Sequence, residues 1–127
     1  MRKILKPSVI PAILWAFTLA ILMLLPSDAF PESKLFSYDK LAHFGVFFIL
    51  SCLVGWGFIA ARNSHLLSIK DLLTIFLITF TYSSALELLQ YFVPGRMTDL
   101  YDFIANSMGG LFGLVVFYIF TQRSLQN

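Results

Sequence analysis

The sequence predicts an all-α membrane protein in which four transmembrane helices form one bundle. Of its 127 residues, 58% are hydrophobic and only 13% are charged, and the mean hydropathy is +0.81. These values lie well outside the usage of soluble globular chains. Four apolar stretches also reach the roughly 20 residues that a helix needs to cross about 30 Å of hydrocarbon. We therefore expect a single transmembrane domain over residues 1–127.

The first expected helix covers residues 8–25. Pro11 falls near its first turn, where a missing backbone N–H costs little. The basic residues before this stretch and the small residues Ser27 and Ala29 after it also fit a secretory signal peptide that is removed by cleavage. Because the apolar run is longer than the apolar core of about 7–15 residues in such peptides, we favour a retained helix.

The other expected helices cover residues 40–60, 72–92 and 103–121. Three segments rich in Pro, Gly, Asp and Ser separate the four apolar stretches, as is typical of irregular backbone. They are PSDAFPESKLFSYD, the turn around Asn63 and Ser64, and VPGRMTDLYD. The single cysteine, Cys52, lies within an apolar stretch and cannot form an intrachain disulfide.

The distribution of basic residues predicts the orientation of the bundle. With a cytoplasmic N terminus, the inner segments hold Arg2, Lys3, Lys6, Arg62, Lys70 and Arg123. The outer segments hold Lys34, Lys40 and Arg96. The excess on the inner side predicts that both termini are cytoplasmic. Because these residues are scattered and do not form a basic stripe, the net charge of +2 does not favour a nucleic-acid partner.

Polar residues at the outer ends of three helices predict one polar site. Ionisable groups in membrane spans are expensive, so they are usually kept for function or for pairing. Asp39 and His43 are four residues apart at the head of the second helix, and Glu87 lies near the end of the third. Since residues three and four apart share a helix face, further polar residues extend these faces into the bundle. They are Gln90, Asp99, Asp102 and Asn106.

The residue types suggest roles in the site. His43, Glu87 and Asp102 are the candidate catalytic residues, with His43 as nucleophile or general acid/base and a carboxylate to orient it. Arg96 follows the turn at Pro94 and is the candidate phosphate clamp, folded back toward Glu87 or the aspartates. The candidate substrate-binding residues are Asp39, Gln90, Arg96, Asp99 and Asn106. Asp, His and Glu side chains also suit a divalent cation, although no HExxH motif supports one, so metal and cofactor remain open.

Structural interpretations stand beside these roles. The ionisable residues would also serve as a buried network that fixes helix register. Lys40 is expected to be an interfacial residue whose ammonium reaches the head-group region. Gly109 and Gly113 form a small-xxx-small pair, which predicts close packing of the fourth helix against a neighbour.

The combined spacing is similar to a known family. The run from Glu87 to Arg96, followed by Asp99, Asp102, Asn106 and the glycines at 109, 110 and 113, resembles the signature of VanZ-like membrane proteins. Asp39, Lys40 and His43 match that family's motif at the head of its second helix, so the resemblance covers about residues 38–116. It implies a bacterial envelope protein of the class named for raising resistance to teicoplanin. Phe47 stands where the family often has a tyrosine, so a hydroxyl role does not carry over.

Three functions remain open. The chain acts as an enzyme on a lipid-linked substrate at the outer leaflet, as a non-catalytic binder of a lipid head group or envelope precursor, or as a proton-coupled transporter with a Glu87–His43 relay. The transporter is the weakest of the three, because the four short helices show no inverted repeat. A transporter would also need a charged residue on the inner half, and none occurs in the second and third helices before Arg62, Lys70 and Asp71. The expected partners are membrane lipids or a lipid-linked envelope precursor.

Overall fold

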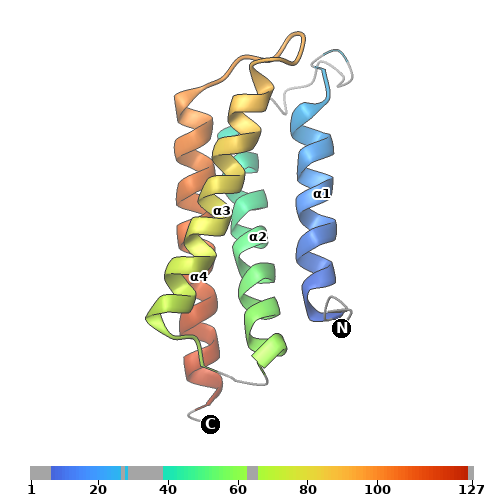
Figure 1. Cartoon of the computed structure of the whole chain (residues 1–127). Helices are drawn as coiled ribbons and strands as arrows, with labels where there is room; N and C mark the ends of the chain where they lie inside the picture. Colours follow the sequence, from blue (N-terminus) through green and yellow to red (C-terminus); the bar gives the residue numbers. More distant parts are fainter. Residues whose placement is uncertain (1–6, 27, 29–38, 63–65, 126–127) are drawn as a thin grey trace.

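The computed structural model is an antiparallel bundle of four helices (Figure 1). It describes residues 7–26, 28, 39–62 and 66–125. A short 3₁₀ helix, η1 (Pro7–Val9), leads into α1 (Ile10–Leu24), α2 (Asp39–Arg62), α3 (Ile69–Gln90) and α4 (Leu100–Ser124). The start of α1 and the end of α4 lie at the same end of the bundle (Figure 1). The predicted all-α fold is confirmed, and the described residues contain no strand.

Three of the four helices are long and apolar enough to cross a membrane. They are α2, α3 and α4, with mean hydropathies of 2.2, 1.7 and 1.8 over their most apolar 18 residues. The fourth, α1, is apolar but has 15 residues, which rise about 22 Å against about 30 Å of hydrocarbon. It ends early because Leu25 precedes a proline and takes an extended conformation, with ψ at 140°. The prediction of four transmembrane helices therefore holds for three of them.

Several positions used in the sequence interpretation lie outside the described residues. They are Arg2, Lys3 and Lys6, the residues Ser27 and Ala29 of the alternative cleavage site, Lys34, and the expected turn at Asn63 and Ser64.

Local capping sets the limits of α3 and α4. Ser68 and Asp71 form a capping box, in which the Ser68 N–H donates to Asp71 Oδ2 at 2.9 Å, so α3 starts at residue 69 and not at 72. Asp99 caps α4 by accepting from the Tyr101 N–H at 2.8 Å, so α4 starts at residue 100 and not at 103. Between them, Gly95 has a φ of 75°, as the predicted turn requires.

The backbones of α2 and α4 are in direct contact. A Cβ atom on Gly109 or Gly113 would overlap the carbonyl oxygen of Phe44 or Phe48, respectively. The thiol of Cys52 also donates to the carbonyl of Gly113 at 3.4 Å. The predicted close packing of the glycine pair is confirmed, and α2 is its partner. This contact fixes the head of α2 beside the head of α4.

The shorter helix α1 is held by an apolar core and by hydrogen bonds. Leu19 and Met23 pack into a core with Phe47, Leu50 and Leu86. Trp15 Nε1 donates to the carbonyl oxygen of Val46 at 2.9 Å, and the hydroxyl of Tyr82 donates to the carbonyl of Ala16. In a membrane such bonds are worth about 1 kcal/mol each. They tie α1 to α2 and α3 along the length of the bundle.

Candidate functional site

Seven polar side chains meet where α2 and α4 begin and α3 ends, and we refer to them as the polar cluster. They are Asp39, Lys40 and His43 from α2, Glu87 from α3, and Asp99, Asp102 and Asn106 from α4. The cluster is graded in depth. The Lys40 side chain is 47% exposed, whereas that of Glu87 is 8% exposed and lies between the helices. The predicted convergence of polar residues from three helices is therefore present in the structure.

In the outer half of the cluster, Lys40 lies among three aspartates. Its ammonium donates to Asp99 Oδ2 at 2.5 Å and also to Asp102 Oδ1, and it lies 3.8 Å from Asp39 Oδ2. The hydrogen bond from Lys40 and that from the Tyr101 N–H hold the pKa of the Asp99 carboxyl below its usual value. The sequence interpretation of Lys40 as an interfacial residue was incomplete. Its position three residues before His43 was the available signal, because it places both on one helix face.

In the inner half, Asn106 joins His43 to Glu87. The Asn106 amide nitrogen donates to Glu87 Oε1 at 2.9 Å, so the amide oxygen faces His43 Nδ1, also at 2.9 Å. An amide oxygen only accepts, so Nδ1 carries a proton, and whenever the imidazole is neutral its lone pair is on Nε2. This tautomer follows from the hydrogen-bond pattern. We refer to the three side chains as the His43–Asn106–Glu87 relay.

The second ring nitrogen of His43, Nε2, faces two carboxylates. Nε2 lies 3.6 Å from Asp39 Oδ1 and 4.0 Å from Asp102 Oδ2. On the other side of the relay, Glu87 Oε2 is buried without a hydrogen-bond partner among the described residues. Both features are unusual for a network that only joins helices, because buried polar atoms are normally paired. The predicted catalytic residues His43, Glu87 and Asp102 are thus within one connected group.

Two predicted site residues are directed toward α1. Gln90 is buried, and its amide nitrogen donates to the carbonyl oxygen of Met23 at 3.0 Å. Arg96 donates to the carbonyls of Leu25 and Leu22 at 3.0 and 3.3 Å. Both satisfy carbonyl groups at the end of α1, which have no intrahelical partner. The predicted approach of Arg96 to Glu87 or to the aspartates is not among these contacts, and Lys40 is the cation in that place. A ligand-binding role for Gln90 and Arg96 stays a prediction.

Between the polar cluster and the opposite end of the bundle, the buried polar side chains are uncharged hydroxyls. Ser51, Thr79 and Ser83 are at most 2% exposed, and the hydroxyls of Ser51 and Ser83 have no hydrogen-bond partner among the described residues. Along α2, α3 and α4, no Asp, Glu, Lys, Arg or His lies between the cluster and the residues near the opposite end, Arg62 and Asp71 among them. A charged path through the membrane is therefore absent from these three helices.

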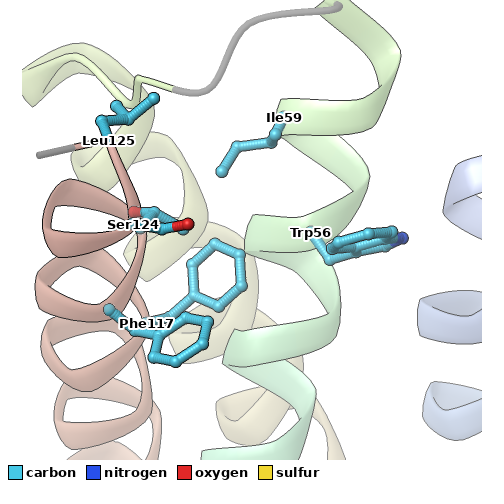
Figure 2. A pocket seen from close by; sticks show the side chains of 7 residues that line it. Trp56, Ile59, Phe117, Ser124 and Leu125 are labelled. Atoms are coloured by element: carbon cyan, nitrogen blue, oxygen red, sulfur yellow. The ribbon is translucent and has the colours of Figure 1, made fainter. Parts of the chain in front are cut away.

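A hollow at the opposite end of the bundle has a different character. It lies between the last turns of α2 and α4, and Figure 2 shows Ile59 and Phe117 approaching it from the two helices. Its lining is formed by Trp56, Ile59, Phe117, Phe120, Thr121, Ser124 and Leu125. It contains no ionisable side chain, so the chemistry of the described residues is concentrated in the polar cluster.

Comparison with known proteins identifies the family. The model of the VanZ/LLP1 family matches residues 5–121, which include the whole polar cluster. The chain belongs to the VanZ/LLP1 family. A protein of Schizosaccharomyces pombe, named only as uncharacterized, is 31% identical over 89 residues, which are 70% of this chain and 52% of that protein. The chain thus spans about half the length of this relative. No solved structure matches the chain significantly.

Membership of the VanZ/LLP1 family confirms the resemblance found in the sequence and its class of multi-pass helical membrane protein. Phe47, which stands where the family often has a tyrosine, is fully buried, and its ring centroid lies 6.4 Å from that of Tyr82. At this position the side chain fills the core between α1, α2 and α3.

Proposed function

We propose that this VanZ/LLP1-family protein binds the phosphorylated head group of a membrane lipid or lipid-linked precursor in its polar cluster. The observation that carries the proposal is the graded exposure of the cluster at the end of the bundle. Lys40 and Asp39 are reachable from outside, and His43 lies just below them. A head group held there would have its acyl chains in the surrounding lipid.

The distribution of charge supports a location at the outer leaflet. Arg62, Lys70 and Arg123 lie at the end of the bundle opposite to the cluster, and basic residues favour the cytoplasmic side. A crossing by α1, which is tied to α2 and α3, would place both termini on that same side. The cluster would then face the outer leaflet, where envelope precursors are used.

The His43–Asn106–Glu87 relay supports a chemical role in addition to binding. The relay fixes His43 with its Nε2 lone pair directed outward, toward Asp39 and Asp102. In this orientation His43 is placed as a general base toward a water or hydroxyl on the head group, or as a nucleophile. Asn106 and Glu87 would act as positioning residues.

The alternative function is a network that only fixes helix register. Two observations weigh against it. Glu87 Oε2 is buried without a partner among the described residues, and Nε2 of His43 is farther from both carboxylates than a hydrogen bond allows. A purely structural network gains nothing from either feature, since well-packed apolar side chains would join the helices at lower cost.

Teicoplanin tolerance is part of the proposal as a consequence in a bacterial host. The family resemblance supports it, and altered processing or availability of a lipid-linked precursor would provide the physical link. The relative in a yeast favours a chemistry that bacteria and fungi share, which is why the proposal is framed around a phosphorylated head group.

The test compares lipids and lipid-linked precursors in cells that lack the protein. The cells are complemented with wild type, with Glu87→Gln, or with Lys70→Gln as a control at the opposite end. The proposal expects a change in one phosphorylated lipid that wild type and Lys70→Gln reverse and Glu87→Gln does not. Identical lipid profiles in all four strains, at equal protein levels, would contradict it.

A further inference from the structure

The charge of the polar cluster does not suit a bare phosphate. Three aspartates surround the Lys40 ammonium, and Glu87 adds a fourth carboxyl group deeper in the cluster, beside His43. Even with Glu87 protonated, the acidic groups outnumber the cation by three to one. The nearby Arg96 donates to carbonyls of α1. A phosphorylated head group would meet net repulsion here unless another cation accompanied it.

The donor atoms of three side chains are arranged as ligands of one ion. One ligand atom each from Asp39, His43 and Asp102 lies within 4.8 Å of the others. Two atoms that each bind a metal at about 2.1 Å are at most about 4.2 Å apart. The separations of His43 Nε2 from Asp39 Oδ1, 3.6 Å, and from Asp102 Oδ2, 4.0 Å, meet this limit. The two aspartate oxygens lie within 4.8 Å of each other, so binding one ion would need the side chains to move together by a few tenths of an ångström at most. Both exceed the length of a hydrogen bond.

Lys40 leaves these ligand atoms free. Its ammonium contacts the other oxygen of each carboxylate, namely Oδ2 of Asp39 and Oδ1 of Asp102. The two aspartates therefore present one oxygen to Lys40 and the other to the lone pair of His43. Two carboxylate oxygens and a lone pair that face one another repel unless a proton or a metal ion lies between them.

A second observation comes from Glu87, below His43. Its side chain is more than nine-tenths buried, lies 3.8 Å from His43 Nδ1 through Oε1, and has an unpartnered Oε2. The other ring nitrogen of a metal-bound histidine usually donates to a fixed acceptor, which orients the ring and raises the basicity of the ligand. Here Nδ1 faces the amide oxygen of Asn106, and Asn106 is in turn held by Glu87. A cation bound at Nε2 would offset the free-energy cost of burying the Glu87 carboxyl group below His43.

We propose that Asp39, His43 and Asp102 bind a divalent cation of the Mn²⁺ or Zn²⁺ type, and that this ion holds the phosphate of the head group. Two carboxylates and one imidazole suit such ions. The Asp39 side chain is 38% exposed, so water or phosphate oxygens would complete the coordination from its side. The lipid part rests on the proposed function, whereas binding of the cation alone does not.

The first test is titration of the purified full-length chain in detergent micelles with Mn²⁺, with free Mn²⁺ measured by electron paramagnetic resonance. Wild type is expected to bind one Mn²⁺, with competition by Zn²⁺. His43→Gln and Asp102→Asn are expected to weaken binding by at least about tenfold. Helix content by circular dichroism confirms that each variant is folded.

Two further variants separate a coordination site from a diffuse counterion effect. Asp99→Asn removes one negative charge from the cluster without removing a ligand, and asparagine still caps α4, so affinity is expected to stay within about threefold of wild type. Lys40→Gln removes a competing cation and is expected to tighten Mn²⁺ binding by about threefold or more. Equal losses for Asp99→Asn and Asp102→Asn, or no stoichiometric binding by wild type, would overturn the inference.

The second test uses dihexanoyl phosphatidic acid as a phosphomonoester probe, with and without Mn²⁺. Tighter probe binding with Mn²⁺ in wild type but not in Asp102→Asn supports the inference. Probe binding that is independent of Mn²⁺, with no Mn²⁺ bound, overturns the cation site and leaves the proposed function intact. Stoichiometric Mn²⁺ binding without any probe binding keeps the cation site and contradicts the proposed function.

Discussion

The contact between α2 and α4 makes Gly109→Ala the most informative substitution for the architecture of the site. The new Cβ would overlap the carbonyl oxygen of Phe44 and lie 2.9 Å from Phe44 Cα. Both atoms belong to the α2 backbone and cannot rotate away. The helices would have to separate by on the order of 1 Å, a gap that forfeits a quarter to a half of the dispersion energy across the contact.

The expected cost of Gly109→Ala is about 1–3 kcal/mol, even after the higher helix propensity of alanine is counted. Two other glycines provide matched controls. A Cβ on Gly110 would meet the hydroxyls of Ser51 and Thr79 at 3.4 Å, an ordinary contact, so Gly110→Ala is expected to be close to neutral. Nothing lies within 4 Å of a Cβ on Gly45, so Gly45→Ala is expected to stabilise α2 by about 0.5–1 kcal/mol.

The assay is unfolding of the purified protein in mixed detergent micelles with increasing dodecyl sulfate, followed by circular dichroism. The predicted order of stability is Gly45→Ala, then Gly110→Ala, then Gly109→Ala. His43 and Asn106 lie beside this contact, so Gly109→Ala is also expected to weaken ligand binding at the cluster. Equal stability of Gly109→Ala and Gly45→Ala would refute the direct backbone contact.

Two further predictions concern the polar cluster. Asn106→Ala removes the partner of both His43 Nδ1 and Glu87 Oε1 and is expected to cost about 1–2 kcal/mol. Without Asn106, the proton on the His43 ring is no longer held at Nδ1 and is expected to exchange between the two nitrogens, which nitrogen NMR of the imidazole would detect. An unchanged Nδ1–H signal would argue against the relay. Because the pKa of Asp99 is lowered by Lys40, their contact contributes stability above the ordinary aspartate pKa of about 3.9 and loses it as the pH falls further. The stability difference between wild type and Asp99→Asn is therefore expected to shrink below about pH 4, and a constant difference at lower pH would contradict this assignment.

Much of the fold is predictable from the sequence because membrane helices carry strong local signals. Apolar stretches located α2, α3 and α4, and the observed limits differ from the predicted ones by three residues or fewer. The shifts at the starts of α3 and α4 come from caps formed by Ser68 and Asp99. Hydropathy does not locate such caps, because a polar side chain that starts a helix lies outside the apolar stretch.

The candidate site is predictable to the extent that helix periodicity defines it. His43, Glu87, Asp102 and Asn106 lie on faces that point into the bundle, and the structure joins them. The glycine pair on α4 predicted a close contact but not its partner, because small residues specify proximity without specifying a neighbour.

The contacts of long side chains near helix ends were not predictable. Lys40, Gln90 and Arg96 each reach several neighbouring groups, and the choice among them depends on where α1 packs. The end of α1 presents unpaired carbonyls, and these receive Gln90 and Arg96. Lys40 is left as the cation of the aspartates. Nothing in the spacing of residues places α1 beside α3. That Lys40, and not Arg96, contacts the aspartates is therefore visible only in the structure.

The most direct measurement of the central claim is native mass spectrometry of the full-length protein, purified in mild detergent with the lipids that it retains. Wild type and Lys70→Gln are expected to retain one class of phosphorylated lipid or lipid-linked precursor, whereas His43→Gln and Glu87→Gln are expected to lose it while circular dichroism shows that they remain folded. If the retained lipids are the same in all four proteins, the polar cluster is not a head-group site. The register network would then be its function.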